Sequence, residues 1–235
     1  MDKNILAIET TTHKCSVALQ VVGSQCLVRS HIASRDHAQK ILPMIDELLK
    51  EAGVTLPDLD ALAFGRGPGS FIGTRVSAGI AQGLAFGMSI PLIPISTLKI
   101  MAQGCRRKYG AENVALATDA KMSEIYWARY SCRSQERWHL IDSEIAIAPD
   151  VLPQYLEPDN LVWFCAGTGW EKYTQTLSRI PLSIMSSEII YPDAKDLISL
   201  ARYELEEKSA VPIEMAGPVY LRETALWKKL PGRNN

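Results

Sequence analysis

The sequence has 235 residues, 47% of them hydrophobic, and carries 25 basic against 26 acidic side chains for a formal net charge of −1. This length and apolar content can support one large domain or two modest ones. The balanced charge excludes an overall basic field that would recruit nucleic acid, and no apolar run is long enough to cross a bilayer. We therefore expect no membrane attachment.

The N-terminal sequence and the cysteines indicate a cytoplasmic protein. MDKNILAIET lacks the basic and then apolar layout of a secretion signal, and we expect it to lead directly into a strand. The five cysteines are odd in number and form no CxxC pair, which argues against a disulfide framework and against a zinc knuckle.

The first half of the chain alternates strands and helices. Strands are expected at 4–8, 15–22, 25–32, 60–64 and 91–95, with a two-residue turn at Gly23-Ser24 joining the second to the third. Apolar residues at three-four spacing predict a helix that Ser34 caps and Gly53 ends. Further helices are expected at about 72–87 and from Ser96, as a cap, to about 109.

The second half repeats this order. Strands are expected at 113–118, 124–130, 137–147 and 161–165, with helices at 149–156, 170–178 and 193–208, and residues 182–185 between the last two. The βββαβα order thus recurs roughly 100–110 residues further on. Glu9 and Asp119 end the first strands of the two halves, and Gly-x-Gly follows the fourth strand in each.

This pattern predicts an α/β fold of two duplicated βββαβα lobes with mixed sheets, the second lobe being reduced. The expected boundaries are 1–109 and 110–211, with 212–235 returning to the first lobe. The arrangement is similar to the ribonuclease H-like lobes of the actin, sugar-kinase and Hsp70 superfamily, which flank a nucleotide cleft. That similarity makes Glu9, Thr10, Thr11, Gly67 and Asp119 candidates for phosphate or nucleotide binding, although a fold does not by itself imply a function.

The stretch FGRGPGSFIGTRVSAGIAQGLAFG, residues 64–87, holds the most distinctive local pattern. Its loop is neither a Walker A motif nor GxGxxG, so a tight turn and an anion site at the helix N-terminus both remain open. Ser70 is a poor candidate for a nucleophile, because Pro68 and Ile72 stand where GxSxG requires glycine. The histidines form no HExxH or HxxxH motif.

The helix in this stretch contains Gly79 and Gly83 in its interior, four residues apart. Each interior glycine costs about 1 kcal/mol relative to alanine. A chain tolerates that cost where another backbone must approach closely, so we expect this helix to hold a partner.

Several long motifs together resemble the bacterial TsaB (YeaZ) family over essentially the whole chain. The matching segments are ASRDHAQKILPMIDELL, GRGPGSFIGTRVSAGIAQGLAFG, TDAKMSEIYWARY and PVYLRETALWKKLPG. The resemblance implies a subunit that pairs with TsaD to make threonylcarbamoyladenosine next to the tRNA anticodon, with the ATPase TsaE joining the assembly. It also implies a homodimer when the chain is alone, tRNA contact only through the complex, and no intrinsic cofactor, with any ATP belonging to the assembled complex.

TsaD-like proteins carry a histidine pair at the positions held here by Thr97 and Met101. Neither side chain suits the hard or borderline metal ion that a histidine site of this kind binds. The resemblance therefore implies no catalytic metal, no catalytic residues and no peptidase activity.

Pairing in the family uses helices of the first lobe, which places the partner interface on residues 36–52 and about 72–87. The expected interface residues are Met44, Leu48, Val76, Gly79, Ile80 and Gly83, with His37 at the rim. Some of these could instead pack inside their own lobe. The competing functions are an ATPase that uses Glu9 and Asp119 and, less favoured, a metallopeptidase; contact of Lys228 and Lys229 with tRNA also stays open.

Overall fold

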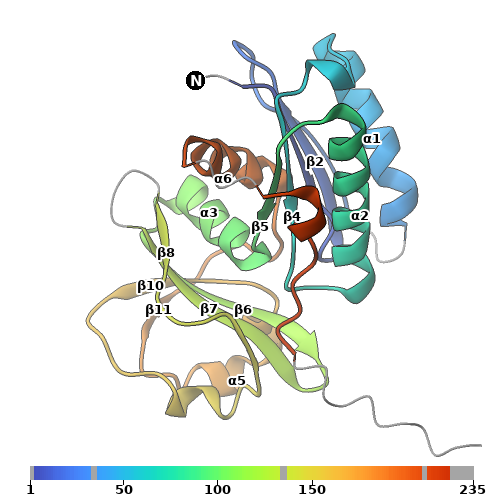
Figure 1. The fold of residues 1–235 in the computed structure, drawn as a ribbon. Coiled ribbons are helices and arrows are strands. Elements are labelled where there is room, and N and C mark those ends of the chain that lie inside the picture. Colours follow the sequence, from blue (N-terminus) through green and yellow to red (C-terminus); the bar gives the residue numbers. More distant parts are fainter. Residues whose placement is uncertain (1–2, 33–35, 133–136, 208–210, 223–235) are drawn as a thin grey trace, which may run out of the picture.

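Two α/β lobes, each built on one mixed sheet, make up the chain in a computed structural model (Figure 1). The structure describes residues 3–32, 36–132, 137–207 and 211–222. The predicted α/β class with two mixed sheets is confirmed. No helix in these ranges combines the length and the apolar character that a membrane span needs.

The first lobe contains a five-stranded sheet in the order β3-β2-β1-β4-β5. The strands are β1 (Ile5–Glu9), β2 (Lys14–Gln20), β3 (Leu27–Ile32), β4 (Ala61–Gly65) and β5 (Leu92–Ile95). β1 pairs antiparallel with β2 and parallel with β4. Because side chains alternate along a strand, Leu6 and Ile8 enter the core on one face, whereas Ile5 and Ala7 enter the core on the other.

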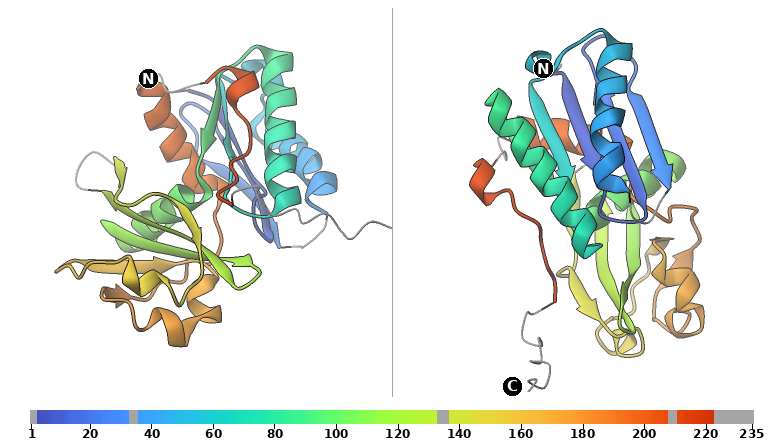
Figure 2. Two further views of the ribbon diagram at one scale, coloured as in Figure 1. Left: turned by 60° about the horizontal axis from the view of Figure 1, so that its bottom comes forward. Right: turned by 90° about the vertical axis from the view of Figure 1, so that its right-hand side faces the viewer.

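Helices α1 (His37–Ala52) and α2 (Phe71–Met88) lie side by side on one face of this sheet (Figures 1 and 2). Helices α3 (Thr97–Tyr109) and α6 (Ala194–Glu206) lie between the two sheets and share one apolar core with both. Although α6 belongs by sequence to residues 110–211, it packs against β1, β2, β4 and β5 of the first lobe. The two lobes are thus joined by a common core.

The second sheet has the order β11-β10-β6-β7-β8, with β9 also paired to β7. Its strands are β6 (Asn113–Lys121), β7 (Glu124–Cys132), β8 (Trp138–Leu140), β9 (Ile145–Ile147), β10 (Val162–Ala166) and β11 (Ser183–Met185). Read from β8, the strand order repeats that of the first sheet, which confirms the duplication. A 3₁₀ turn at Leu152–Gln154 stands where the first lobe has α1, and the short α4 (Gly169–Lys172) and α5 (Thr174–Leu177) correspond to α2.

The connection between β2 and β3 is longer than the predicted two-residue turn. Leu19 faces Leu27 across the pair, so residues 21–26 form the loop. Gly23, at φ +75°, lies in a turn in which Ser24 N donates to Val21 O at 3.1 Å. The Gln20 amide donates to the same carbonyl of Val21 and to that of Ser24, and these bonds stabilise the wider loop.

The single strand predicted at 137–147 is divided into β8 and β9, both paired with β7. The segment between them leaves the sheet because its acidic side chains bind β7: Asp142 accepts hydrogen bonds from Arg129, and Glu144 accepts one from Tyr130. The predicted helix at 170–178 is likewise divided, at Tyr173.

The predicted helix ends agree with the structure where local capping determines them. Gly53 ends α1 at φ 68°, and the Ser96 hydroxyl accepts hydrogen bonds from Leu98 N and Lys99 N at the start of α3. Asp36 is the N-cap residue of α1, and the expected cap Ser34 lies outside the described residues.

Candidate functional site

Glu9, at the end of β1, is a fully buried carboxyl group. Its Oε1 accepts hydrogen bonds from Thr11 N at 2.6 Å and from Thr11 Oγ1 at 2.5 Å, whereas Oε2 has no partner among the described residues. Burial raises the pKa of Glu9 to about 7, against the lowering effect of the Thr11 hydrogen bonds. Glu9 therefore supports the β1–β2 loop from inside the protein.

The β1–β2 loop packs directly on the N-terminus of α2. Ser70 N donates to Thr11 O at 2.7 Å, and Thr10 Oγ1 donates to Gly73 O at 2.8 Å. A Cβ at Gly69 would lie 2.3 Å from Thr11 O, and one at Gly73 would lie 2.1 Å from Thr10 O. Gly69 in the loop and Gly73 in the first turn of α2 thus allow a close backbone contact. This contact favours the tight turn over an anion site, because the chain itself supplies an acceptor for Ser70 N.

Gly67 is held between α3 and the C-terminal segment. Its φ of +100° suits glycine, its carbonyl accepts a hydrogen bond from Thr97 N at 2.9 Å, and a Cβ there would lie 2.9 Å from Val219 O. Val219 N donates in turn to Arg66 O at 2.8 Å. This segment continues to the second lobe, where Arg222 pairs with Glu124 at 2.6 Å.

Asp119, in β6, is the counterpart of Glu9 in the second lobe. Burial opposes its ionisation, but hydrogen bonds from Lys121 and Lys172 outweigh burial and lower the pKa of Asp119 to about 2. The Nζ atoms of Lys121 and Lys172 lie 2.8 and 2.9 Å from its carboxylate oxygens. This carboxylate is ionised and already neutralised within its own lobe.

Thr97 and Met101 stand at the two positions where TsaD-like proteins carry histidines, and their surroundings do not fit a metal site. Thr97 donates its hydroxyl hydrogen to Thr11 Oγ1 at 2.9 Å, and Met101 is buried in the core between the sheets. The Thr97 hydroxyl is thus already hydrogen-bonded, and the Met101 thioether lies in an apolar core. Together they do not provide two suitable metal ligands. No group of three or more His, Cys, Asp or Glu residues in the described ranges could hold a metal ion.

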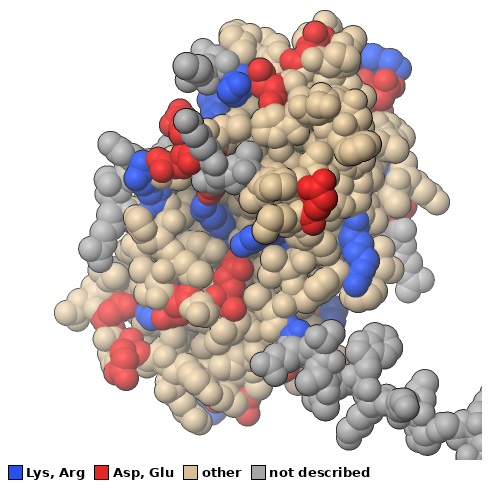
Figure 3. All heavy atoms as spheres, viewed as in Figure 1, with Lys and Arg blue, Asp and Glu red and all other residues tan. Residues whose placement is uncertain are grey.

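The outer side of α2 forms a second candidate site, which we name the α2 face. It consists of Ile72, Val76, Gly79, Ile80, Gly83, Phe86 and Gly87. Ile72 and Phe86 are 71% and 74% exposed, and a Cβ at any of the three glycines would meet no atom of the described residues within 4 Å. Arg75 is the one charged residue of the helix, and the surface over α2 carries few charged side chains (Figure 3).

Two residues expected at a partner interface lie elsewhere. Met44 and Leu48 are buried in the core beneath α1, at 8% and 0% exposure, because they share the helix face that packs on the sheet. Of the other expected residues, Gly79 and Gly83 are exposed, and Val76 and Ile80 are half-buried. His37 is half-buried, and its Nε2 lies 2.7 Å from Thr12 O.

Sequence reasoning missed Ile72 and Phe86, together with an aromatic cluster at the start of α2. In that cluster the Arg75 guanidinium lies 3.3 Å from the ring centre of Phe71 and 4.9 Å from that of Tyr220. The scarcity of charge along residues 71–88, where Arg75 alone is charged, could have indicated the two exposed apolar residues. Tyr220 joins the aromatic cluster only because the C-terminal segment passes beside the start of α2, and the sequence alone does not show that path.

Comparisons with known proteins agree on one family. A family model described as TsaD, tRNA N6-adenosine threonylcarbamoyltransferase, matches residues 28–161. A protein of Escherichia coli named tRNA threonylcarbamoyladenosine biosynthesis protein TsaB is 42% identical over 97% of this chain and 99% of its own length. The protein of that name from Haemophilus influenzae is 44% identical, with coverages of 97% and 98%.

The solved structures agree with the sequence relatives. A Pseudomonas aeruginosa protein, described as having similarity to the peptidase YeaZ, matches with a TM-score of 0.85 at 42% identity. The match covers 94% of this chain and 100% of that one.

Proposed function

The chain belongs to the TsaB family of tRNA threonylcarbamoyladenosine biosynthesis proteins, and we propose that it is the non-catalytic subunit that binds a TsaD subunit through the α2 face. In this role it holds TsaD in the state that transfers a threonylcarbamoyl group to the adenosine next to the tRNA anticodon. TsaE and tRNA join through the assembled complex in the cytoplasm, and the chain alone pairs with a second copy through the same face.

The observation that carries this proposal is the set of exposed glycines in α2. Interior helix glycines cost about 1 kcal/mol each. Gly79, Gly83 and Gly87 bring no compensating contact with the described residues, because their outward side is open there. Together with the exposed Ile72 and Phe86 they form an apolar surface on which a partner helix can approach closely.

The non-catalytic role is supported by the other candidate site. Glu9 and Asp119 are engaged inside their own lobes, and Thr97 and Met101 replace the histidines of TsaD-like proteins. We therefore propose that any ATP used by the assembly binds outside this chain.

Capture of TsaD by affinity-tagged variants tests the proposed interface. Gly79→Leu combined with Gly83→Leu should abolish capture, because the new side chains hold a partner helix away, whereas Gly79→Ala should weaken it less. Glu171→Leu combined with Gln175→Leu is the control, since it places two leucines at exposed positions four residues apart in the second lobe. Undiminished capture by the folded double variant would overturn this assignment.

Reconstitution of tRNA modification tests the catalytic assignment separately. With a threonylcarbamoyl donor and ATP present throughout, TsaD, TsaE and tRNA should yield modified adenosine only when this chain is added, and this chain with tRNA should yield none without TsaD. Product formed without TsaD, or equal yields with and without this chain, would contradict the proposed role.

A further inference from the structure

A pocket of about 550 Å³ lies between α3 and α6, away from the α2 face. This volume is in the range of small-molecule sites, roughly 300–1,000 Å³. Its polar lining includes Gln103, Arg106, Arg107, Glu112, Lys195 and Arg202. Four of these are cationic, and Glu112 is the one acidic residue in the described lining, although the whole chain has a net charge of −1. Positive charge is therefore concentrated here.

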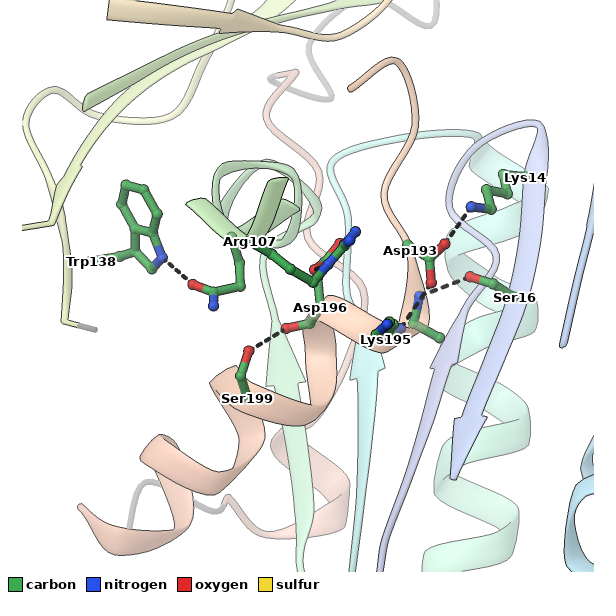
Figure 4. A network of polar contacts seen from close by, with 10 residues as sticks. Lys14, Ser16, Arg107, Trp138, Asp193, Lys195, Asp196 and Ser199 are labelled. Carbon is green, nitrogen blue, oxygen red and sulfur yellow. Dashed lines mark hydrogen bonds and ion pairs between the residues drawn. The ribbon is translucent and has the colours of Figure 1, made fainter. Parts of the chain in front are cut away.

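Arg107 is fixed in place by a buried carboxylate. Its guanidinium lies against the carboxylate of Asp196 (Figure 4). Nε and Nη2 donate to Asp196 at 2.6 and 3.2 Å, and Asp196 is 3% exposed. Gly104 makes room for this carboxylate, because a Cβ there would lie 3.0 Å from Asp196 Oδ2. The ion pair leaves Nη1 of Arg107 available to a ligand and orders the guanidinium in advance.

The other three cations have no such partner in the part of the chain that the structure describes. Among the described residues, no carboxylate lies within ion-pair distance of Arg106, Lys195 or Arg202, whereas nearby Lys14 and Lys99 pair with Asp193 and Glu204. Lys195 and Arg202 are seven residues apart and so project from the same side of α6. Gln103 accepts a hydrogen bond from Trp138 Nε1 at 2.7 Å through its carbonyl, which leaves its amide hydrogens as donors.

We propose that this pocket binds a phosphate group. Nearly all of its polar side chains are donors, three of the four cations lack an ion-pair partner within the described chain, and guanidinium groups match phosphate oxygens in pairs. The phosphate can belong to a small phosphorylated molecule or to the backbone of an RNA. The site lies on different elements from the α2 face, so it does not depend on the proposed binding of TsaD.

Binding of two probes to the full chain tests this site. The probes are inorganic pyrophosphate, followed by titration calorimetry, and a fluorescein-labelled tRNA transcript, followed by anisotropy. Lys195→Ala with Arg202→Ala should weaken binding by about tenfold or more, since each substitution removes a charge-assisted hydrogen bond. The matched control is Lys50→Ala with Arg179→Ala, which removes two exposed cations elsewhere.

The two probes also identify the source of the phosphate. Binding of pyrophosphate that the double variant loses indicates a small phosphorylated ligand, and loss restricted to tRNA indicates an RNA backbone. The proposal is overturned if neither probe binds the wild-type chain, or if the double variant and its control bind equally well. Circular dichroism and unchanged capture of TsaD would show that the double variant is folded.

Discussion

A Cβ atom at Gly65 would lie 1.9 Å from Glu9 Oε2 and 2.8 Å from Glu9 Cδ. The two residues end the adjacent parallel strands β4 and β1, so the buried carboxyl occupies the space that a side chain at position 65 would fill. The glycine that begins the loop before α2 is thus required by the carboxyl group of Glu9.

Replacement of this glycine should destabilise the protein. We expect Gly65→Ala to lower the free energy of unfolding by about 1–3 kcal/mol, because overpacking forces a carboxyl that is hydrogen-bonded to Thr11 to move. Gly79→Ala is the matched control and should raise the free energy of unfolding by up to about 1 kcal/mol, since its Cβ meets open space in a helix. Urea denaturation measures both, and equal effects of the two substitutions would refute this packing argument.

Stability should depend on pH through Glu9. Burial raises the pKa of Glu9 from 4.5 to about 7, so the folded state binds a proton that the unfolded state has lost between these pH values. The contribution of Glu9 to the free energy of unfolding is therefore fully favourable below pH 4.5. It declines by about 3 kcal/mol in all as the pH rises to 7. Glu9→Gln should remove this part of the slope in unfolding free energies measured from pH 4.5 to 7. An unchanged slope would show that Glu9 is ionised in the folded protein.

Truncation of Leu48 should lower the stability of the protein, whereas truncation of Ile72 should weaken capture of TsaD. Leu48→Ala removes a fully buried side chain and should cost about 2–5 kcal/mol of stability. Ile72→Ala removes an exposed one, so the free energy of unfolding should change by no more than about 0.5 kcal/mol, while capture of TsaD weakens. Denaturation and capture assays on both variants give the comparison. Strong destabilisation by Ile72→Ala, or intact capture, would count against the α2 face as the interface.

The stability of the protein should depend on the two carboxylates that pair with the buried Arg129. Asp142 and Asp159 lie 2.6 and 3.2 Å from its guanidinium nitrogens, and only 9% of the Arg129 side chain is exposed. Asp142→Asn with Asp159→Asn should cost about 3 kcal/mol, because a buried cation loses its compensation. Asp46→Asn, in the exposed pair with Lys50, should cost less than about 1 kcal/mol. A small effect of the double substitution would mean that water solvates Arg129.

Local signals determined much of the fold. The order of strands and helices, the duplication, and the ends of helices at Gly53 and Ser96 follow from periodicity and capping, which act between residues a few positions apart. The exposed glycines Gly79 and Gly83 were also recognisable, because a helix interior disfavours glycine in any surroundings.

Tertiary structure alone decided what each candidate residue contacts. Gly65 and Gly69 look like Gly79 in the sequence, yet a Cβ at the first two would collide with Glu9 or Thr11, whereas at the third it would meet open space. Similarly, the helical period places Leu48 on an apolar stripe without telling whether the sheet or a partner covers it. These outcomes depend on contacts between residues distant along the chain, and such contacts exist only once β1, β4 and the helices have packed together.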